Sequence, residues 1–456
     1  MQSLSLYLQP MTQKNKLGLF DFTMIVIGLV IGMGIFRTAK DAAGAALNPT
    51  IYFAAWVAGG IIALCGALTY AEIGSRYPVT GGYYRVFSYA YHPSIAFALN
   101  ASILISNAAS VSGVALIGAG YISKVFWGPD AGNMVKVMIA MSAIFIFYGV
   151  NMMGLKLSAK TQSVLMLIKI SMILLLISAL FFVPAFESTS AATVANENIG
   201  WQNWIQSFGL CLIAVSFTYG GYQQTINFGS EVNQASKNIP KAIFIGIAVI
   251  IILYLTVNVA YYKIVGFENM KTTGEIASVV VEKMFGLQGA NIFSGLLFLS
   301  VLAYVNVSLL SNPRVMFAMS EDGVFPKIFR KQNEQKGVMV VSLTIFAAVC
   351  VIVLFFADTF EKILSFSIFL DSFGMATSAA TIFMLRKRTK HLDGTGIYKM
   401  KFFPLQPIVF IAAYVFVCAS IISATPGIAL TGTAVLVGFT LLYFLIKPKG
   451  NTESNN

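Results

Sequence analysis

Two glycine-rich segments interrupt apolar runs that are long enough to cross a bilayer: Val30-Ile31-Gly32-Met33-Gly34 and Phe217-Thr218-Tyr219-Gly220-Gly221. A helix that spans a membrane bonds its own backbone N–H and C=O groups, because lipid offers no partner. Backbone that leaves the helix at membrane depth is tolerated only where it faces protein or a polar cavity. The two breaks therefore predict a transport site for a ligand near the middle of the membrane.

The two breaks offer complementary chemistry. In the first, Gly32 and Gly34 leave peptide N–H groups unpaired at the positive end of a half-helix, where a carboxylate binds. In the second, the break at Gly220-Gly221 frees carbonyl oxygens at the negative end of a half-helix, which suit an ammonium group. Together they predict a receptor for an α-amino acid.

Each break also has a simpler interpretation. A Gly-x-Gly pattern lets two helices pack closely, without binding anything. Phe217 and Tyr219 are candidates for an aromatic lid over the ligand, and ordinary core packing is the alternative for both.

The elements that hold these breaks are predicted to be membrane helices. Hydrophobic residues make up 57% of the 456 residues and charged residues 11%, whereas a soluble domain carries about 25% charged residues. Apolar runs of about 20 residues predict an all-α polytopic membrane protein with twelve transmembrane helices, near residues 20–46, 49–74, 94–123, 134–154, 160–184, 201–228, 241–264, 290–319, 338–357, 361–385, 403–423 and 427–446.

The net charge of +12 reflects orientation in the membrane. Most Lys and Arg residues fall in segments that are cytoplasmic if the N-terminus is inside, above all 321–336 and 386–401. This asymmetry is typical of membrane proteins and predicts two cytoplasmic termini. It does not indicate nucleic acid binding.

The spacing of the breaks predicts an inverted repeat. They occur in the first and sixth spans, and units of five spans must have opposite orientations, with the ligand between their first helices. We expect a cytoplasmic tail over 1–19, a ten-helix transport core over 20–386 with repeats at about 20–184 and 201–386, a cytoplasmic loop over 387–402, helices 11 and 12 within 403–446, and a cytoplasmic tail over 447–456. Between the second and third spans, the segment 72–84 predicts a short helix at the cytoplasmic surface.

Two charged residues lie deep within predicted spans. A charge at mid-span costs about 2.5–3.5 kcal/mol on insertion scales and usually serves a function. Lys169 could instead extend its ammonium to an interface. Asp371 could carry protons, contact a cationic side chain of the substrate, or act as a neutral structural group.

Four segments carry a family resemblance. They are 26–36 with its Gly-x-Gly, 72–84 with Pro-x-x-Gly-Gly-Tyr, 217–243 with Glu231, and 313–326 with Arg314 and Asp322-Gly323-x-x-Pro326. On these segments the sequence resembles amino acid permeases of the APC superfamily, particularly the bacterial relatives of the L-type amino acid transporters. The resemblance implies a LeuT-type fold with a 5+5 inverted repeat and broken helices 1 and 6.

The resemblance also implies a binding mode. The substrate carboxylate would meet N–H groups around Met33 and Gly34, and the amine would meet the carbonyls of Val30, Phe217 and Gly220, with Phe217 as a gating aromatic. Relatives usually have Ser in place of Met33, so a hydroxyl donor is missing here.

The resemblance implies a role for only one of the two buried charged residues. Lys169 matches the fifth-span lysine of sodium-independent members, whose ammonium bridges to the unwound part of span 1 where sodium-coupled relatives hold sodium. The family usually has an uncharged residue at Asp371, so no role carries over to it.

These observations predict a sodium-independent secondary active transporter for amino acids, in a plasma membrane such as the bacterial inner membrane. A mostly apolar pocket favours neutral substrates, moved by proton symport or by exchange. Asp371 keeps an antiporter for cationic amino acids or polyamines open, and a non-transporting amino acid sensor and a channel are rivals. The sequence has no nucleophile–base arrangement, phosphate-binding loop or metal-ligand spacing, so we expect no enzyme activity and no cofactor, and it implies no partner subunit.

Overall fold

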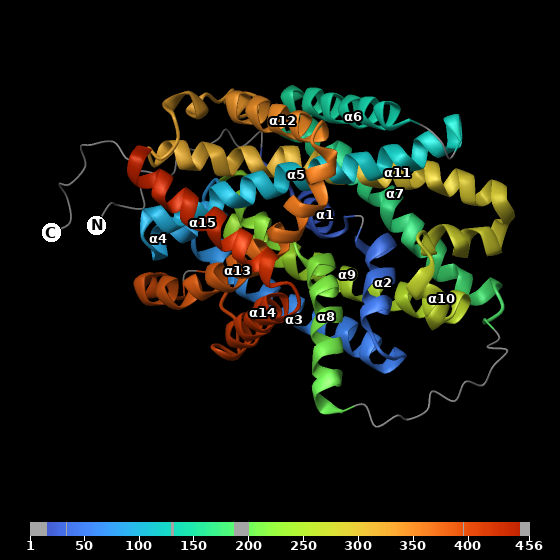
Figure 1. Cartoon of the computed structure of the whole chain (residues 1–456). Helices are drawn as coiled ribbons and strands as arrows, with labels where there is room; N and C mark the ends of the chain where they lie inside the picture. The colour runs from blue at the N-terminus through green and yellow to red at the C-terminus, as the bar shows by residue number, and fades with distance from the viewer. Residues whose placement is uncertain (1–15, 33, 129–131, 187–199, 395, 447–456) are drawn as a thin grey trace.

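The described part of the chain is built from helices (Figure 1). The computed structural model describes residues 16–32, 34–128, 132–186, 200–394 and 396–446. Within these residues, pairing between extended segments is confined to the isolated bridges Leu17–Val232, Thr80–Phe228 and Asn333–Val338. The expected all-helical class is therefore confirmed for the described chain.

The helices follow the predicted spans closely along the chain. From the N-terminus they are α1 (Leu19–Val30), α2 (Gly34–Ala45), α3 (Pro49–Arg76), α4 (Gly82–Ala90), α5 (Pro93–Trp127), α6 (Asn133–Met153) and α7 (Leu155–Phe182). After residues 187–199, which are not described, come α8 (Trp201–Tyr219), α9 (Ala235–Val265), α10 (Phe267–Thr272), α11 (Ile276–Glu321), α12 (Val340–Leu354), α13 (Ala357–Arg388), α14 (Leu405–Ala424) and α15 (Pro426–Ile446). Short 3-10 helices connect some of them: η3 (Tyr222–Asn227), η4 (Gly229–Glu231), η5 (Lys327–Arg330) and η6 (Lys390–Leu392).

Ten helices of the described chain, with α1 and α2 counted as one, are long and apolar enough to cross a membrane. The predicted sixth and ninth spans are absent from this group, although each corresponds to a helix. Helix α8 begins with Gln202, Asn203 and Gln206, which lower its hydropathy, and α12 has only 15 residues. The protein is therefore a multi-pass membrane protein.

The connection between α3 and α4 shows how local chemistry sets helix ends. Helix α3 starts at Pro49, where the side-chain oxygen of Asn48 accepts a hydrogen bond from the Ile51 N–H over 2.9 Å. It ends at Arg76, just before Tyr77-Pro78, since proline disfavours helix in the residue before it. The short helix predicted within 72–84 starts later, at Gly82, because Gly81 adopts a left-handed conformation (φ +64°).

Two features of the second half were not predicted. A short helix, α10, follows α9, and α11 begins at Ile276, about four turns before the predicted start of its span. Gly286 has φ +70° and kinks α11 between these parts. The kink separates a leading segment from the part that matches the predicted span.

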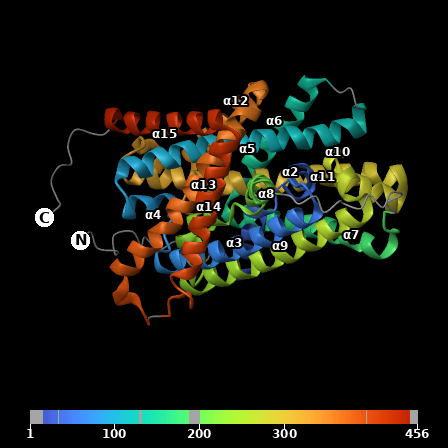
Figure 2. The same cartoon turned by 60° about the horizontal axis from the view of Figure 1, so that its bottom comes forward.

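The long helices pack lengthwise around the two breaks. Helix α3 packs against α8 and α9, while α5 packs against α11, α12 and α15. Figure 2 shows α3, α5, α9, α11 and α15 running roughly alongside one another. Helices α1, α2 and α8, which carry the breaks, lie among them, and α6 and α12 form the upper edge in Figure 1.

Candidate functional site

The first break separates α1 from α2. Helix α1 ends at Val30, and Ile31 caps it with a non-helical conformation (φ −74°, ψ 83°). The Gly32 N–H donates to the Val30 carbonyl over 2.8 Å, so this predicted donor is already engaged. Gly34 begins α2, and the first N–H groups of a helix lack intrahelical acceptors. Met33, predicted to face the ligand, lies outside the described residues.

The second break follows α8. The Gly220 N–H donates to the Phe217 carbonyl over 3.2 Å, and Gly221 has φ +113°, which favours glycine. The Gly221 N–H then donates to Oε1 of Gln223 over 2.8 Å. The helix therefore ends here, and the chain continues as the tighter η3.

The two breaks contact each other. A Cβ atom on Gly221 would lie 2.0 Å from the carbonyl oxygen of Leu29, and one on Gly34 would lie 2.9 Å from Cγ2 of Thr218. Close approach of two backbones thus requires glycine at Gly221, and close contact with the Thr218 side chain favours glycine at Gly34. Segments nearly 190 positions apart in the sequence form one site.

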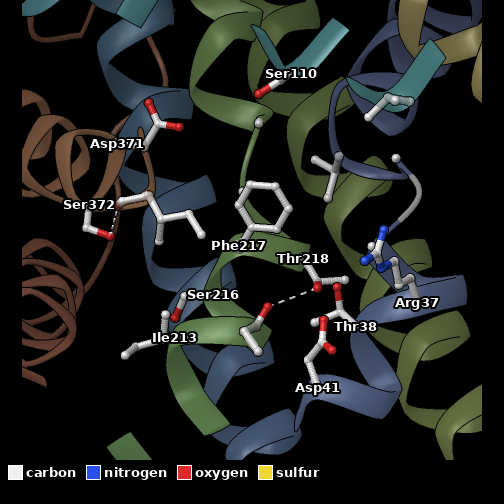
Figure 3. A pocket seen from close by; sticks show the side chains of 18 of the residues that line it. Arg37, Thr38, Asp41, Ser110, Ile213, Ser216, Phe217, Thr218, Asp371 and Ser372 are labelled. Carbon is white, nitrogen blue, oxygen red and sulfur yellow. Dashed lines mark hydrogen bonds between the residues drawn. The ribbon is translucent and has the colours of Figure 1, made fainter. Parts of the chain in front are cut away.

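A cavity of about 1040 Å³ lies beside the joined breaks (Figure 3). Its walls come mainly from α1, α2, α5, α8, α11, α13 and α14, with residues of η3 and α15 added. Six of the predicted ligand-binding residues line it: Val30, Gly32, Gly34, Phe217, Gly220 and Gly221. Phe217 is 43% exposed, and its ring stands in the cavity.

Two other predicted residues do not line the cavity. The ring of Tyr219 is buried and packs against Trp56 and Tyr254, with ring centroids 5.9 and 5.1 Å apart. Tyr219 therefore occupies the core position that was its alternative. Ile31 is also buried, and its carbonyl oxygen accepts a hydrogen bond from Lys169.

Lys169 reaches the first break from α7. Its side chain is buried, and Nζ donates to the Ile31 carbonyl over 2.6 Å. The lysine therefore does not extend to an interface. It places a cation donor against backbone that has left the helix.

Asp371 lies on α13 and lines the cavity. In the described chain its carboxylate has no hydrogen bond and no ion pair, while the neighbouring Ser372 hydroxyl donates to the Ile368 carbonyl over 2.8 Å. A structural group would be expected to bond its surroundings. Among the described residues, no hydrogen-bond or ion-pair partner thus supports the interpretation of Asp371 as a structural group.

Several polar side chains of the cavity were not predicted. Asn107 and Ser110 on α5, Tyr304 and Ser308 on α11, and Thr218 on α8 line it. On α5 and α11 the sequence carries a signal for them. Asn107 and Ser110 are three positions apart and Tyr304 and Ser308 are four apart, which places each pair on one face of its helix.

Ion pairs close the opposite end of the helices. The cavity extends to Ala45, at the end of α2, and to Thr425. Helix α3 begins shortly after Ala45 and ends at Arg76. There Glu72 pairs with Arg76 at 2.7 Å and with Arg386 at 2.6 Å. Hydrogen bonds from Arg76 and Lys399 lower the pKa of Asp393 below its usual value.

Two further ion-paired groups lie at this end. Arg85 on α4 pairs with Glu321 at 2.6 Å and with Asp322, both at the end of α11. Arg314 pairs with the buried Glu231 at 2.6 Å and stacks over Phe228. These contacts join α4, η4 and α11. No group of three or more metal-ligating His, Cys, Asp or Glu side chains occurs in the described ranges.

Comparisons with known proteins agree with this architecture. The family model described as "Amino acid permease" matches residues 17–446. The serine/threonine exchanger SteT of Bacillus subtilis (strain 168) is 26% identical over 443 residues, which cover 96% of this chain and 98% of that protein. The branched-chain amino acid permease BcaP of the same organism is 28% identical over 69% of this chain and 68% of that protein. The large neutral amino acids transporter small subunit 2 of Homo sapiens is 23% identical over 96% of this chain and 82% of that protein.

These relatives are transporters, permeases and exchangers, which points away from enzyme activity. The chain belongs to the amino acid permease family, within the APC superfamily.

Proposed function

We propose that this protein is a secondary active transporter that moves amino acids by alternating access. The observation that carries the proposal is the contact between the two helix breaks, marked by Gly221 against Leu29, beside a cavity. Helix ends that meet at mid-membrane offer backbone donors and acceptors to one small molecule.

The binding mode follows from the polarity of the two helix ends. The substrate carboxylate binds at the N-terminal end of α2, beginning at Gly34, where the helix dipole is positive. The substrate amine binds the carbonyl oxygens of Val30, Phe217 and Gly220. The Phe217 ring, which stands in the cavity, covers the ligand.

Transport is independent of sodium in this proposal. The ammonium of Lys169 bonds the Ile31 carbonyl, and a bound sodium ion would need carbonyl ligands of this kind. A fixed cation at the break makes a diffusible one unnecessary.

We further propose a LeuT-type fold with twelve spans and the repeats 20–184 and 201–386, with α14 and α15 outside them. The helices α8 and α12, although less apolar or shorter than the other spans, occupy the predicted sixth and ninth positions in chain order. Both termini would be cytoplasmic, in a bacterial inner membrane, so the cavity opens outward and the ion pairs close the cytoplasmic end.

Much of the cavity wall is apolar and includes Leu29, Val114 and Ile213. Such a wall supports amino acids with neutral side chains as the general substrate class. Two relatives, a serine/threonine exchanger and a branched-chain amino acid permease, are named for amino acids with uncharged side chains. Exchange and proton symport are both compatible with one binding site. Asp371, which has no ion-pair partner among the described residues, favours a second candidate, transport of cationic amino acids.

Uptake by the purified protein in proteoliposomes tests the proposal. We expect labelled amino acid to accumulate, and unlabelled amino acid inside to accelerate its entry. A sensor would bind without flux, and a channel would show no acceleration by internal substrate. Either result would replace the transporter assignment.

A further inference from the structure

Asp371 is an acidic side chain without a protein partner, within the described chain, at the wall of the cavity. It lies on the same face of α13 as Ile368 and Met375, which also line the cavity. Ser372, next in sequence, bonds back to its own helix. The carboxylate is therefore directed to whatever fills the cavity (Figure 3).

The charges that line the cavity do not balance. They are Arg37, Asp41 and Asp371. Arg37 and Asp41 are one turn apart on α2, a spacing at which opposite charges compensate each other. In Figure 3 they lie together with Thr38, and Phe217 stands between this group and Asp371. One negative charge is left over at Asp371.

Lys169 does not supply the missing charge. Its Nζ is bound to the Ile31 carbonyl, and the residue is not part of the cavity wall. No Lys, Arg or His of the described chain lies within ion-pair distance of Asp371.

Aromatic side chains line the same cavity as the carboxylate. They are Tyr304 on α11 and Tyr414 on α14. A carboxylate beside aromatic rings is a receptor for an ammonium group, through a charge-assisted hydrogen bond and cation–π attraction.

We propose that Asp371 forms an ammonium subsite, so that the substrates include amino acids whose side chain ends in an amine. This rests on the proposed function, because the helix breaks hold the α-amino and α-carboxylate groups. A zwitterion with an apolar side chain carries no net charge and leaves Asp371 unpaired. A cationic amino acid neutralises it.

Competition binding on the purified full chain tests the subsite with a matched pair of ligands. L-lysine and L-norleucine share the same carbon chain, and norleucine lacks the terminal amine. We expect wild-type protein to bind lysine more tightly than norleucine, and Asp371→Asn to weaken lysine binding about tenfold or more. Norleucine binding by that variant should persist or improve. Cadaverine, which lacks the α-carboxylate, should bind more weakly than lysine.

Glu268→Gln is the matched control. It removes the same charge from an exposed side chain on α10 that is not part of the cavity wall, so the lysine preference should remain. Asp371→Glu keeps the carboxylate and should keep the preference. Asp371→Ser replaces Asp371→Asn if the latter fails to fold, as judged by norleucine binding.

Three results would overturn the subsite. One is equal binding of lysine and norleucine by the wild type, and another is an unchanged lysine preference in the neutral variants. The third is loss of proton-driven norleucine uptake in Asp371→Asn with lysine preference intact, which would make Asp371 a proton carrier. Absence of binding by every amino acid would instead contradict the proposed function itself.

Discussion

Lys169 and Ile31 lie 138 positions apart and are joined by a hydrogen bond of 2.6 Å from Nζ to the carbonyl oxygen. The bond ties α7 to Ile31, the residue that directly follows the end of α1. We expect Lys169→Met, which keeps the packing volume and removes the donor, to abolish uptake. Membrane integration and elution as a single species should be unchanged. Wild-type uptake by this variant would show that the unwound segment holds itself in place.

Transport should be insensitive to sodium, because the ammonium of Lys169 occupies the position beside the break. Replacing sodium by N-methylglucamine on both sides of the proteoliposome membrane should leave the initial uptake rate unchanged. Choline serves as a second replacement ion, to exclude an effect of N-methylglucamine itself. Strict dependence on sodium would contradict the assigned role of Lys169 and leave the site at the breaks intact.

Gly221→Ala should lower the thermal midpoint and abolish substrate binding. Its methyl group would lie 2.0 Å from the Leu29 carbonyl oxygen at a φ of +113°, and overpacking of this kind costs about 1–3 kcal/mol. Gly149→Ala is the control, since a Cβ there meets nothing within 4 Å on α6. If both variants behave alike in a thermal shift assay, the contact between the breaks is not tight.

Recognition should depend on both charged groups of the amino acid backbone. Amino acid methyl esters lack the free carboxylate for which we propose the site at Gly34, and N-acetyl derivatives lack the ammonium for which we propose the site at Gly220. Neither should compete with labelled substrate in proteoliposomes. Full competition by one of them would contradict the assignment of the corresponding helix end to the site. Full competition by both would show that the binding site lies elsewhere.

Acid should remove the contribution of Asp393 to stability. Hydrogen bonds to Arg76 and Lys399 lower its folded-state pKa from the usual 3.8, so the stabilisation is present above that value and is lost as the pH falls below it. Asp393→Asn should therefore lower the thermal midpoint by a constant amount between neutral pH and about pH 5. The gap should narrow at about pH 4 and below. A gap that widens in acid would contradict the assigned ion pair.

The sequence predicted the breaks well because paired glycines in the middle of a long apolar run weaken a helix at a depth where lipid cannot bond the freed backbone. It could not decide which aromatic faces the ligand. Phe217 and Tyr219 are two positions apart and thus about 200° apart around a helix, so they cannot share a face. Only the positions of Trp56 and Tyr254 from other helices show that Tyr219 is the core residue.

The early start of α11 escaped prediction for a related reason. The helical segment before Gly286 contains Glu282 and Lys283, which interrupt its apolar run, and the kink depends on one glycine with positive φ. The partners of Glu72 were equally hidden. Arg386 is 314 positions away, and pairing over such a separation depends on the packing of α3 against α13.

The ion pairs at the closed end have a consequence for kinetics. Opening that end would separate Arg85 from Glu321 and Asp322, and hydrated charges would then face the solution on one side of the membrane only. Dissolved salt screens charges that water can reach and has little effect on buried pairs. Salt in the compartment facing Arg85 should therefore accelerate the opening of that end and slow its closure, whereas the same salt on the other side should not, so the two directions of transport would respond differently to one solution.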